Sequence, residues 1–298
     1  MHHREQPARR WFWLPPRLAT TFAAVVIVLL SFSSVVAASS SALPDQALYP
    51  VKRTVEDARL MLAGVDGQDV GHVVFGHVVN TEPKDMYLSR VAAVNGGCAI
   101  ETPAFNANRL CGSGLQAIVS ASQAIMLGDC DVAIGGGAEN MSRAPYASLA
   151  TRFGARMGDT KMVDMMVGAL HDPFHTIHMG VTAENVVAQF GIGREAQDAL
   201  ALESHARAEK AWAEGRFKDQ IVPVMLKSRK GDVAFDKDEH FRPGAKLEDF
   251  QKMKAVFVKE NGTVTAGNAS GINDGAAAVL LMEAGAAKAR GAKPLARL

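Results

Sequence analysis

The sequence has few cysteines for its length, and they form no pattern. Only three occur in 298 residues, Cys98, Cys111 and Cys130. An odd number without a C-x-x-C pair argues against both a disulfide framework and a zinc site. An excess of charge is also lacking, because the formal net charge is +1 and no long basic run occurs. The composition therefore predicts no nucleic-acid partner.

A metal site is not predicted either. Three of the nine histidines lie close together, at His171, His175 and His178. The intervening Asp172-Pro173 would interrupt any helix that aligned their side chains, because proline breaks a helix interior.

Apolar residues are plentiful, and their spacing predicts alternating strands and helices. At 48% of the chain they are sufficient for a core in one or two domains. The apolar pattern predicts a strand over 69–79, a helix over 86–94, a short buried strand over 132–134 that the glycines 135–137 end, a strand over 276–282 and a last helix to about 290. This alternation predicts a layered α/β domain.

The segment from 142 to 259 has a different texture. It is rich in methionine and charge and has few strand-like runs. Its longest predicted element is a helix from Arg194 to Glu214, which Gly215 ends. We therefore expect a mostly helical insertion between the parts of the α/β domain.

The N-terminus resembles a targeting segment. Four arginines precede an uncharged stretch from Leu18 to Pro44. Leu18 to Ala38 is about the 20 residues needed to span a bilayer. This pattern predicts a signal peptide or anchor over 1–42 with membrane contact through Leu18 to Ala38; a buried strand is the alternative. A linker and a helix that starts at Pro50 are expected over 43–63.

Cys111 lies where an irregular segment meets an apolar helix. Leu115, Ile118, Val119, Ile125 and Met126 have helical spacing and are expected on one buried face, with the small Ser122 between them. The helix dipole and unpaired N–H groups at a helix N-terminus favour a thiolate. Gly112 and Gly114 would let a substrate carbonyl approach the backbone. The site suits a nucleophile that forms an acyl intermediate.

Two other interpretations of this stretch compete with the nucleophile. Cys111 could be a small buried apolar residue, as most free cysteines are. Residues 112–117 also match the dinucleotide-binding pattern G-x-G-x-x-A. That pattern should follow a hydrophobic strand, and 103–110 is a poor strand, which disfavours this interpretation.

The segments around Cys111 resemble one family. The resemblance is carried by Asn108 to Gly114, Gly128-Asp129, Gly135 to Glu139, Met141-Ser142, Pro145-Tyr146, His178 to Gly180, Thr182 to Asn185 and Thr263 to Gly271. In this order they are similar to the thiolases, the acyl-CoA C-acyltransferases, from about Gly64 to the last residue. Glu82 to Tyr87 and His171 to His175 are most like the bacterial β-ketothiolases. Residues 1 to about 63 show no such resemblance, which suggests a chimeric chain.

The resemblance implies a fold, a reaction and a site. The fold would be a layered α/β/α N-terminal half over 64–141 and 260–298, with a loop domain over 142–259 that covers CoA. The reaction would be acyl transfer between CoA thioesters, in thiolysis or condensation, with Cys111 as the nucleophile and no cofactor besides the CoA substrate. His178, Met179, Arg242 and Ser270 occupy positions near CoA. The family also implies a homo-oligomer and a cytoplasmic location.

Several segments of the family pattern are missing from this sequence. The family takes a basic cysteine, a Gly-His-Pro histidine and an Asn-Glu-Ala-Phe asparagine from its C-terminal half, and none of these segments occurs here. We therefore expect that half to be absent and condensation to be lost, while slow acylation of Cys111 remains. The family's first strand is missing as well, and Val25 to Leu30 could fill its place.

Two alternative functions stay open. One is a membrane-anchored, non-catalytic thiolase-like protein; basic residues before the anchor would place the rest outside the cytoplasm, which conflicts with an intracellular acyl-CoA substrate. The other is a condensing enzyme that uses a carrier-protein substrate. The His178-Met179-Gly180 segment disfavours the second alternative.

Overall fold

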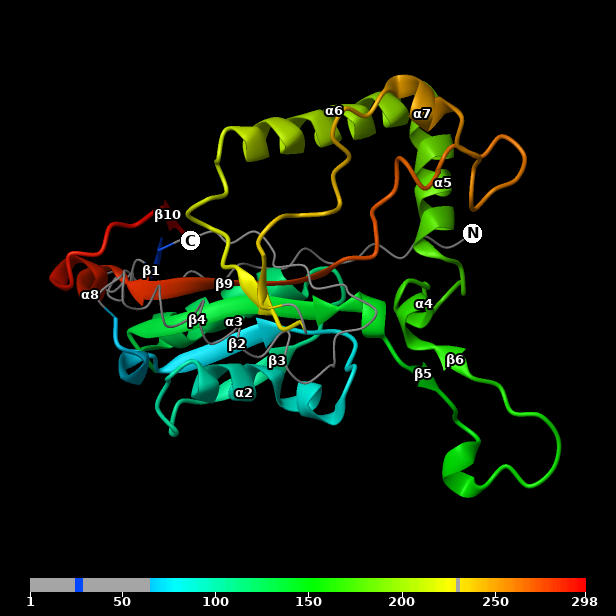
Figure 1. The fold of residues 1–298 in the computed structure, drawn as a ribbon. Helices are drawn as coiled ribbons and strands as arrows, with labels where there is room; N and C mark the ends of the chain where they lie inside the picture. The colour runs from blue at the N-terminus through cyan, green and yellow to red at the C-terminus, as the bar shows by residue number, and fades with distance from the viewer. Residues whose placement is uncertain (1–24, 29–64, 229–230) are drawn as a thin grey trace, which may run out of the picture.

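The computed structural model describes residues 25–28, 65–228 and 231–298, and its centre is a six-stranded mixed sheet (Figure 1). The strands lie in the order β10-β1-β9-β4-β2-β3. Their bounds are β1 Val25–Val28, β2 His72–Gly76, β3 Ala104–Ala107, β4 Val132–Asn140, β9 Asp274–Glu283 and β10 Ala296–Arg297. β2 pairs in parallel with β3 and β4, whereas β9 is antiparallel to β4 and β1.

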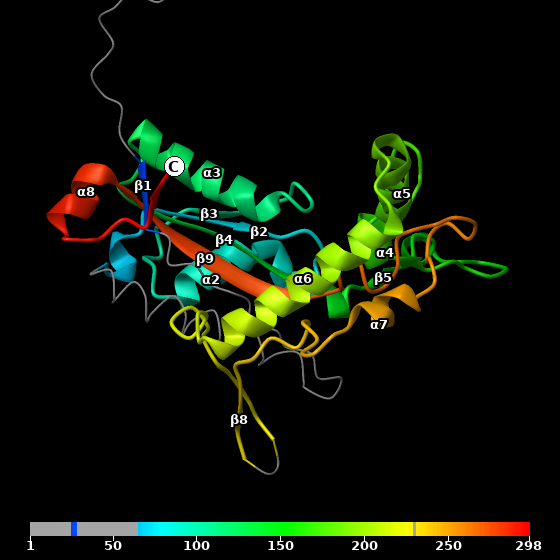
Figure 2. The same ribbon diagram turned by 90° about the horizontal axis from the view of Figure 1, so that it is seen from above.

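Helices cover both faces of this sheet, as the sequence predicts for a layered α/β fold. α3 (Ser113–Leu127) lies on one face and α2 (Leu88–Asn95) on the other, and α8 (Ala284–Ala289) follows β9 (Figure 2). The buried side chains alternate along the strands. Val73 and Phe75 belong to the core beside α2, while Val74 belongs to the core beside α3. This period of two is that of a strand buried on both faces.

The predicted strand over 69–79 is confirmed in its centre by β2, and the helix over 86–94 by α2, which a 3-10 turn, η2 (Pro83–Tyr87), precedes. The strand over 276–282 and the last helix are confirmed by β9 and α8. A further short 3-10 turn, η1 (Gly67–Asp69), leads into β2.

The prediction that the glycines 135–137 end a strand is wrong, because β4 runs through them to Asn140. These glycines allow close packing instead. A Cβ on Gly135 would lie 2.8 Å from the Cα of Ile118 in α3, and one on Gly136 would lie 2.5 Å from the carbonyl oxygen of Ala277 in β9. Glycine in a strand often marks such a close approach of backbones.

The view of 103–110 as a poor strand is also wrong over half of its length, since β3 forms over Ala104–Ala107. Its four residues pair in parallel with β2 at the edge of the sheet. Parallel pairing needs a partner far away in the sequence, which a local pattern does not reveal.

The predicted buried face of the Cys111 helix needs correction. Ser122 and Ile125 are buried as expected, but Leu115 is 67% and Met126 60% exposed. The residues that α3 buries most deeply are the small Ala117 and Ala121. Small side chains permit a short distance between helix and sheet. Close packing, and not the hydrophobicity of the side chains, therefore determines which face of α3 is buried.

Residues 141–260 contribute no strand to the six-stranded sheet in the described ranges. Their elements are η3 Met141–Arg143, β5 Tyr146–Ala147, η4 Thr151–Phe153, β6 Val163–Asp164, α4 Met165–Ala169, α5 Met179–Phe190, α6 Arg194–Ala213, β7 Val224–Leu226, β8 Val233–Phe235 and α7 Leu247–Gln251. The long helix predicted over 194–214 is confirmed by α6. The stretch with β5 and β6 projects away from the sheet (Figure 1).

Most of the expected N-terminal elements, namely the apolar stretch from Leu18 to Ala38 and the helix from Pro50, lie outside the described residues. Within that stretch only Val25–Val28 is described, as the strand β1 between β9 and β10. Among the described residues, a single 18-residue window, Leu110–Leu127, is long and apolar enough to cross a membrane. It contains α3, which packs on the sheet, so it gives no support to a membrane span.

We predict that Gly76→Ala destabilises the fold by about 1–3 kcal/mol, the usual cost of overpacking. Its Cβ would lie 2.5 Å from the carbonyl carbon of Ser113 and 2.6 Å from the nitrogen of Gly114, both backbone atoms of α3. Urea denaturation gives the free energy of unfolding. Gly168→Ala is the matched control, because nothing lies within 4 Å of its Cβ position. Equal stability of the two variants would contradict the close approach.

Candidate functional site

Cys111 lies in a tight turn between β3 and α3. The preceding Leu110 has a φ of 46°, which is the left-handed region that residues other than glycine seldom adopt. The side chain of Asn108 stabilises this conformation, because its Oδ1 accepts a hydrogen bond from the Leu110 N–H at 3.1 Å. Strained backbone of this kind is often found at functional sites.

Ser113 closes the turn around Cys111. Its hydroxyl oxygen accepts a hydrogen bond from the Arg109 N–H at 2.8 Å and donates one to the Leu110 carbonyl oxygen at 2.6 Å. Ser113 is itself buried against Gly76 of β2. The turn is thereby fixed to the sheet on one side, and Cys111 is left exposed on the other.

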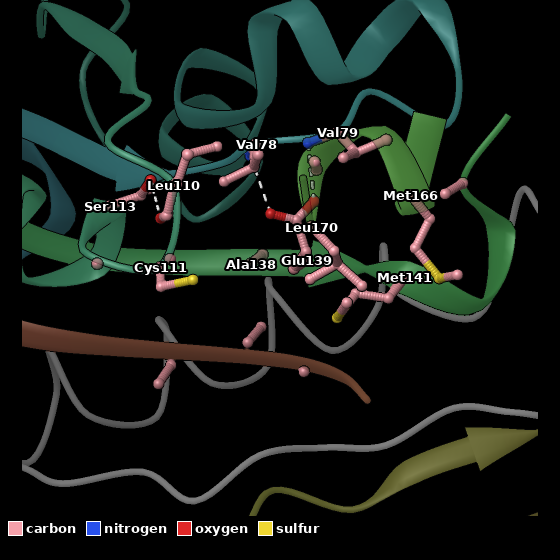
Figure 3. A pocket seen from close by; sticks show the side chains of 18 residues that line it. Val78, Val79, Leu110, Cys111, Ser113, Ala138, Glu139, Met141, Met166 and Leu170 are labelled. Carbon is pink, nitrogen blue, oxygen red and sulfur yellow. Dashed lines mark hydrogen bonds between the residues drawn. The ribbon is translucent and has the colours of Figure 1, made fainter. Parts of the chain in front are cut away.

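A cavity of about 460 Å³ opens beside Cys111 (Figure 3). Its volume is within the range of small-molecule sites in proteins. The wall is largely apolar, and among its described residues the ionisable side chains are Cys111 and Glu139. The lining is Gly76, Val78, Val79, Leu110, Cys111, Ser113, Gly114, Gly137, Ala138, Glu139, Met141, Ala144, Met166, Ala169, Leu170, Gly275, Ala276 and Ala277.

Glu139 fixes one wall of this cavity. Its carboxylate oxygens accept hydrogen bonds from the N–H groups of Val78 at 2.9 Å and Val79 at 3.1 Å. Behind it, the Nδ1 atom of the buried His77 lies 2.8 Å from the Ala138 carbonyl oxygen and 3.6 Å from Glu139 Oε1. The sequence predicted no role for Glu139 or His77. Their partners are backbone groups far away in the chain, and such contacts leave no motif in the sequence.

His178 caps α5. Its Nδ1 atom accepts a hydrogen bond from the Gly180 N–H at 2.9 Å. The ring stacks on Phe257 at a centroid distance of 4.7 Å and packs edge-on against His171 at 5.2 Å. Burial, and then the neighbouring His171, lowers the pKa of His178. The neutral form that caps the helix is therefore the favoured one.

None of the four residues predicted near CoA lines the cavity itself. Met179 lies beside it, because its N–H donates to the carbonyl oxygen of the lining residue Leu170 at 2.8 Å. Arg242 is exposed, and its N–H donates to His205 Nδ1 at 3.1 Å. Ser270 is exposed in the loop that leads into β9.

Two carboxylates hold the loop that precedes Ser270. Glu184 of α5 accepts hydrogen bonds from Thr263 N–H, Thr263 Oγ1 and Val264 N–H, each at 2.8 Å. Asp198 of α6, which is fully buried, accepts one from Asn268 Nδ2 at 2.9 Å and pairs with Arg194 at 2.7 Å. The loop from 263 to 268 is thus fastened to both helices.

The histidines 171, 175 and 178 do not converge on one point. His171 and His178 are in ring contact, whereas His175 is exposed. Across residues 65–228 and 231–298, no group of three His, Cys, Asp or Glu side chains is arranged to hold a metal ion.

Comparison with known proteins gives one family. The family model described as the N-terminal domain of thiolase matches residues 25–285. The match begins at residue 25, within the stretch that shows no resemblance in the sequence alone.

Individual relatives agree with this match. The beta-ketothiolase BktB of Cupriavidus necator is 65% identical over 257 residues, which cover 86% of this chain and 65% of that protein. An acetyl-CoA acetyltransferase of Chromobacterium violaceum is 49% identical over 245 residues, or 82% of this chain and 62% of that one. The chain thus spans less than two thirds of the length of either bacterial relative.

A solved structure has the same fold. It is that of human mitochondrial 3-ketoacyl-CoA thiolase in complex with CoA, and its TM-score to this chain is 0.84 at 37% identity. The similarity covers 92% of this chain and 68% of the human one.

We predict that Glu184→Gln weakens the fold in a pH-dependent way. Burial opposes ionisation of Glu184, but the hydrogen bonds from Val264 and Thr263 outweigh it and lower its pKa. Ionised Glu184 therefore stabilises the fold above the unfolded pKa of about 4.3, and this contribution is lost as the pH falls through the lower folded value. The stability deficit of the variant should be largest near neutrality and shrink below about pH 4.

Thermal unfolding across this pH range measures the deficit. Glu203→Gln is the control, because Glu203 is exposed and pairs with Arg207 on the surface of α6. A deficit of constant size at every pH would refute the assigned role of the Glu184 carboxylate.

Proposed function

The chain belongs to the thiolase family, and on this premise we propose that it transfers acyl groups between CoA thioesters through an acyl intermediate on Cys111. The observation that carries the proposal is the position of Cys111 beside the cavity, in a turn that Asn108 and Ser113 hold in a left-handed conformation. This geometry presents the sulfur to a ligand and keeps the backbone behind it rigid.

The proposed reaction has two transfers. The Cys111 thiolate attacks the carbonyl carbon of an acyl-CoA, the bond to the CoA sulfur breaks, and CoA leaves as a thiol once it takes up a proton. A second CoA thiol then attacks the cysteine thioester, takes the acyl group and restores Cys111. The net result is acyl exchange, with no change in oxidation state.

The cavity wall supports an acyl group at this place. Met141, Met166 and Leu170 form its apolar side (Figure 3). Glu139, whose carboxylate is in the wall, already accepts two backbone hydrogen bonds. An aliphatic chain attached to Cys111 would therefore meet methyl and methylene groups.

We assign the CoA moiety to His178, Met179, Arg242 and Ser270. Met179 is hydrogen-bonded to the cavity wall at Leu170, so a ligand that leaves the cavity there would meet the start of α5. The exposed guanidinium of Arg242 suits the phosphates of CoA, which arginine binds with paired hydrogen bonds. Ser270 follows the loop that Glu184 and Asp198 fasten.

The proposed step lacks an adjacent proton acceptor within the described lining, where no imidazole accompanies Cys111. A positioned base typically contributes about 10²–10⁴-fold to a rate. We therefore expect acylation of this chain to be slow.

Assembly of copies of the chain belongs to the same proposal. The stretch with β5 and β6 exposes large apolar side chains, among them Leu149, Phe153 and Met157. Such exposed groups suit burial between subunits.

We predict that incubation of the purified chain with acetyl-CoA adds one acetyl group, detected by intact-mass spectrometry. Cys111→Ala should carry none, whereas Cys130→Ala should react like the unmodified chain, because Cys130 lies away from the cavity lining. Hydroxylamine should remove the group, as it does for a thioester. Acetylation that persists in Cys111→Ala, or a folded chain that never reacts, would contradict the proposal.

A further inference from the structure

Two side chains of α6 hold the main chain next to Arg242. His205 Nδ1 accepts a hydrogen bond from the Arg242 N–H at 3.1 Å. One helical turn further on, Glu209 Oε2 accepts one from the Gly244 N–H at 3.0 Å. The two acceptors lie on the same face of the helix. They bind residues 242 and 244 of one turn, in which the Ala245 N–H donates to the Arg242 carbonyl oxygen at 3.3 Å and Gly244 has a φ of 68°. They fix the position of this turn and leave Arg242 exposed.

A second histidine connects this segment to the loop of Ser270. The ring of His240 lies 6.0 Å from that of His205. His240 also packs against Gly271, where a Cβ would lie 2.5 Å from His240 Cε1. The pair of histidines therefore joins α6, the Arg242 segment and the residue that follows Ser270.

The His205 hydrogen bond depends on the protonation of the ring. Nδ1 can accept a hydrogen bond only when imidazole is neutral and its proton is on Nε2, because both nitrogens are donors in the protonated form. Protonated His205 would set an N–H against the N–H of Arg242 and a positive charge beside the guanidinium.

The surroundings of His205 favour the neutral ring. His240 and Arg242 face it from the segment, and Phe250 of α7 adds an uncharged ring at 5.8 Å. The carboxylate of Glu209, one turn along α6, acts in the opposite sense, but it accepts the Gly244 hydrogen bond. Burial, then His240 and Arg242, lowers the pKa of His205.

We propose that His205 is a positioning residue whose neutral ring, together with Glu209, holds the Arg242–Gly244 segment so that Arg242 is presented to the phosphates of CoA. Protonation of the ring releases the segment. This inference rests on the CoA role of Arg242 in the proposed function. It adds that binding of CoA weakens as the pH falls, through a group that does not contact the reacting carbonyl.

The test compares the full chain with His205→Gln, whose amide oxygen can accept the same hydrogen bond at any pH. Hydrogen–deuterium exchange, corrected for the intrinsic rate, reports protection of the Arg242 and Gly244 amides. Calorimetric titration with CoA reports affinity. His175→Gln is the control, because His175 is exposed and far along the chain from this segment.

Because the pKa of His205 is lowered, the unmodified chain should lose protection at Arg242 as the pH falls below about 6.5, the ordinary pKa of histidine, while His205→Gln keeps it. Over the same range CoA affinity should fall about fivefold more for the unmodified chain than for His205→Gln, as expected for one lost hydrogen bond. Titration of the CoA phosphates affects both proteins equally, so it cancels in the ratio of their CoA affinities. His175→Gln should behave like the unmodified chain.

Identical pH profiles for the unmodified chain and His205→Gln in both measurements would overturn the inference. A pH-dependent loss of amide protection in a chain that binds no CoA at any pH would have a different meaning. It would support the hold of His205 on the segment and count against the proposed function. The hydrogen–deuterium exchange measurement therefore distinguishes a failure of the His205 inference from a failure of the proposed acyl-transfer function.

Discussion

The contact between the N-terminus of α3 and the glycines of β2 and β4 is the constraint on which the site depends. A side chain on Gly76 would collide with the backbone of Ser113 and Gly114. A Cβ on Gly137 of β4 would lie 3.6 Å from the Cα of Gly114, in ordinary van der Waals contact. Because the helix starts directly on the sheet, the residues before it must turn sharply. Cys111 occupies that turn. It lies beside the cavity because Gly76, which has no side chain, lets the start of α3 pack closely on the sheet.

The same close packing organises the rest of the site. Glu139 continues β4 beyond the glycines and binds the Val78 and Val79 amides, so the strand that supports α3 also supplies a cavity wall. On the other side, Glu184 and Asp198 fasten the loop that enters β9. The carboxylates here form hydrogen bonds with backbone groups and neighbouring side chains, so they hold strands and loops in position. The sulfur of Cys111 is left exposed.

Patterns that depend on neighbours in sequence were predictable. β2, α2, α6 and β9 follow from apolar spacing and from the glycines that end helices, and the resemblance around Cys111 led to the family. Features that depend on distant partners were not. The buried face of α3 consists of Ala117 and Ala121, because the glycines of β4 draw the helix close, and no local hydrophobicity scale would choose alanine over Leu115. The roles of Glu139 and His205 likewise arise from backbone groups far away in the chain.

We infer that the turn held by Ser113, and not the cysteine alone, makes Cys111 competent for acyl transfer. The most direct measurement compares the acetylation rate of Cys111 by acetyl-CoA in the unmodified chain and in Ser113→Ala, with the rate toward a small disulfide reagent as the reference. Loss of the two Ser113 hydrogen bonds should lower acetylation about tenfold or more through misplacement of the sulfur, while the reference rate stays within about twofold. Equal acetylation rates in the two proteins would show that the turn held by Ser113 makes no contribution to the reaction.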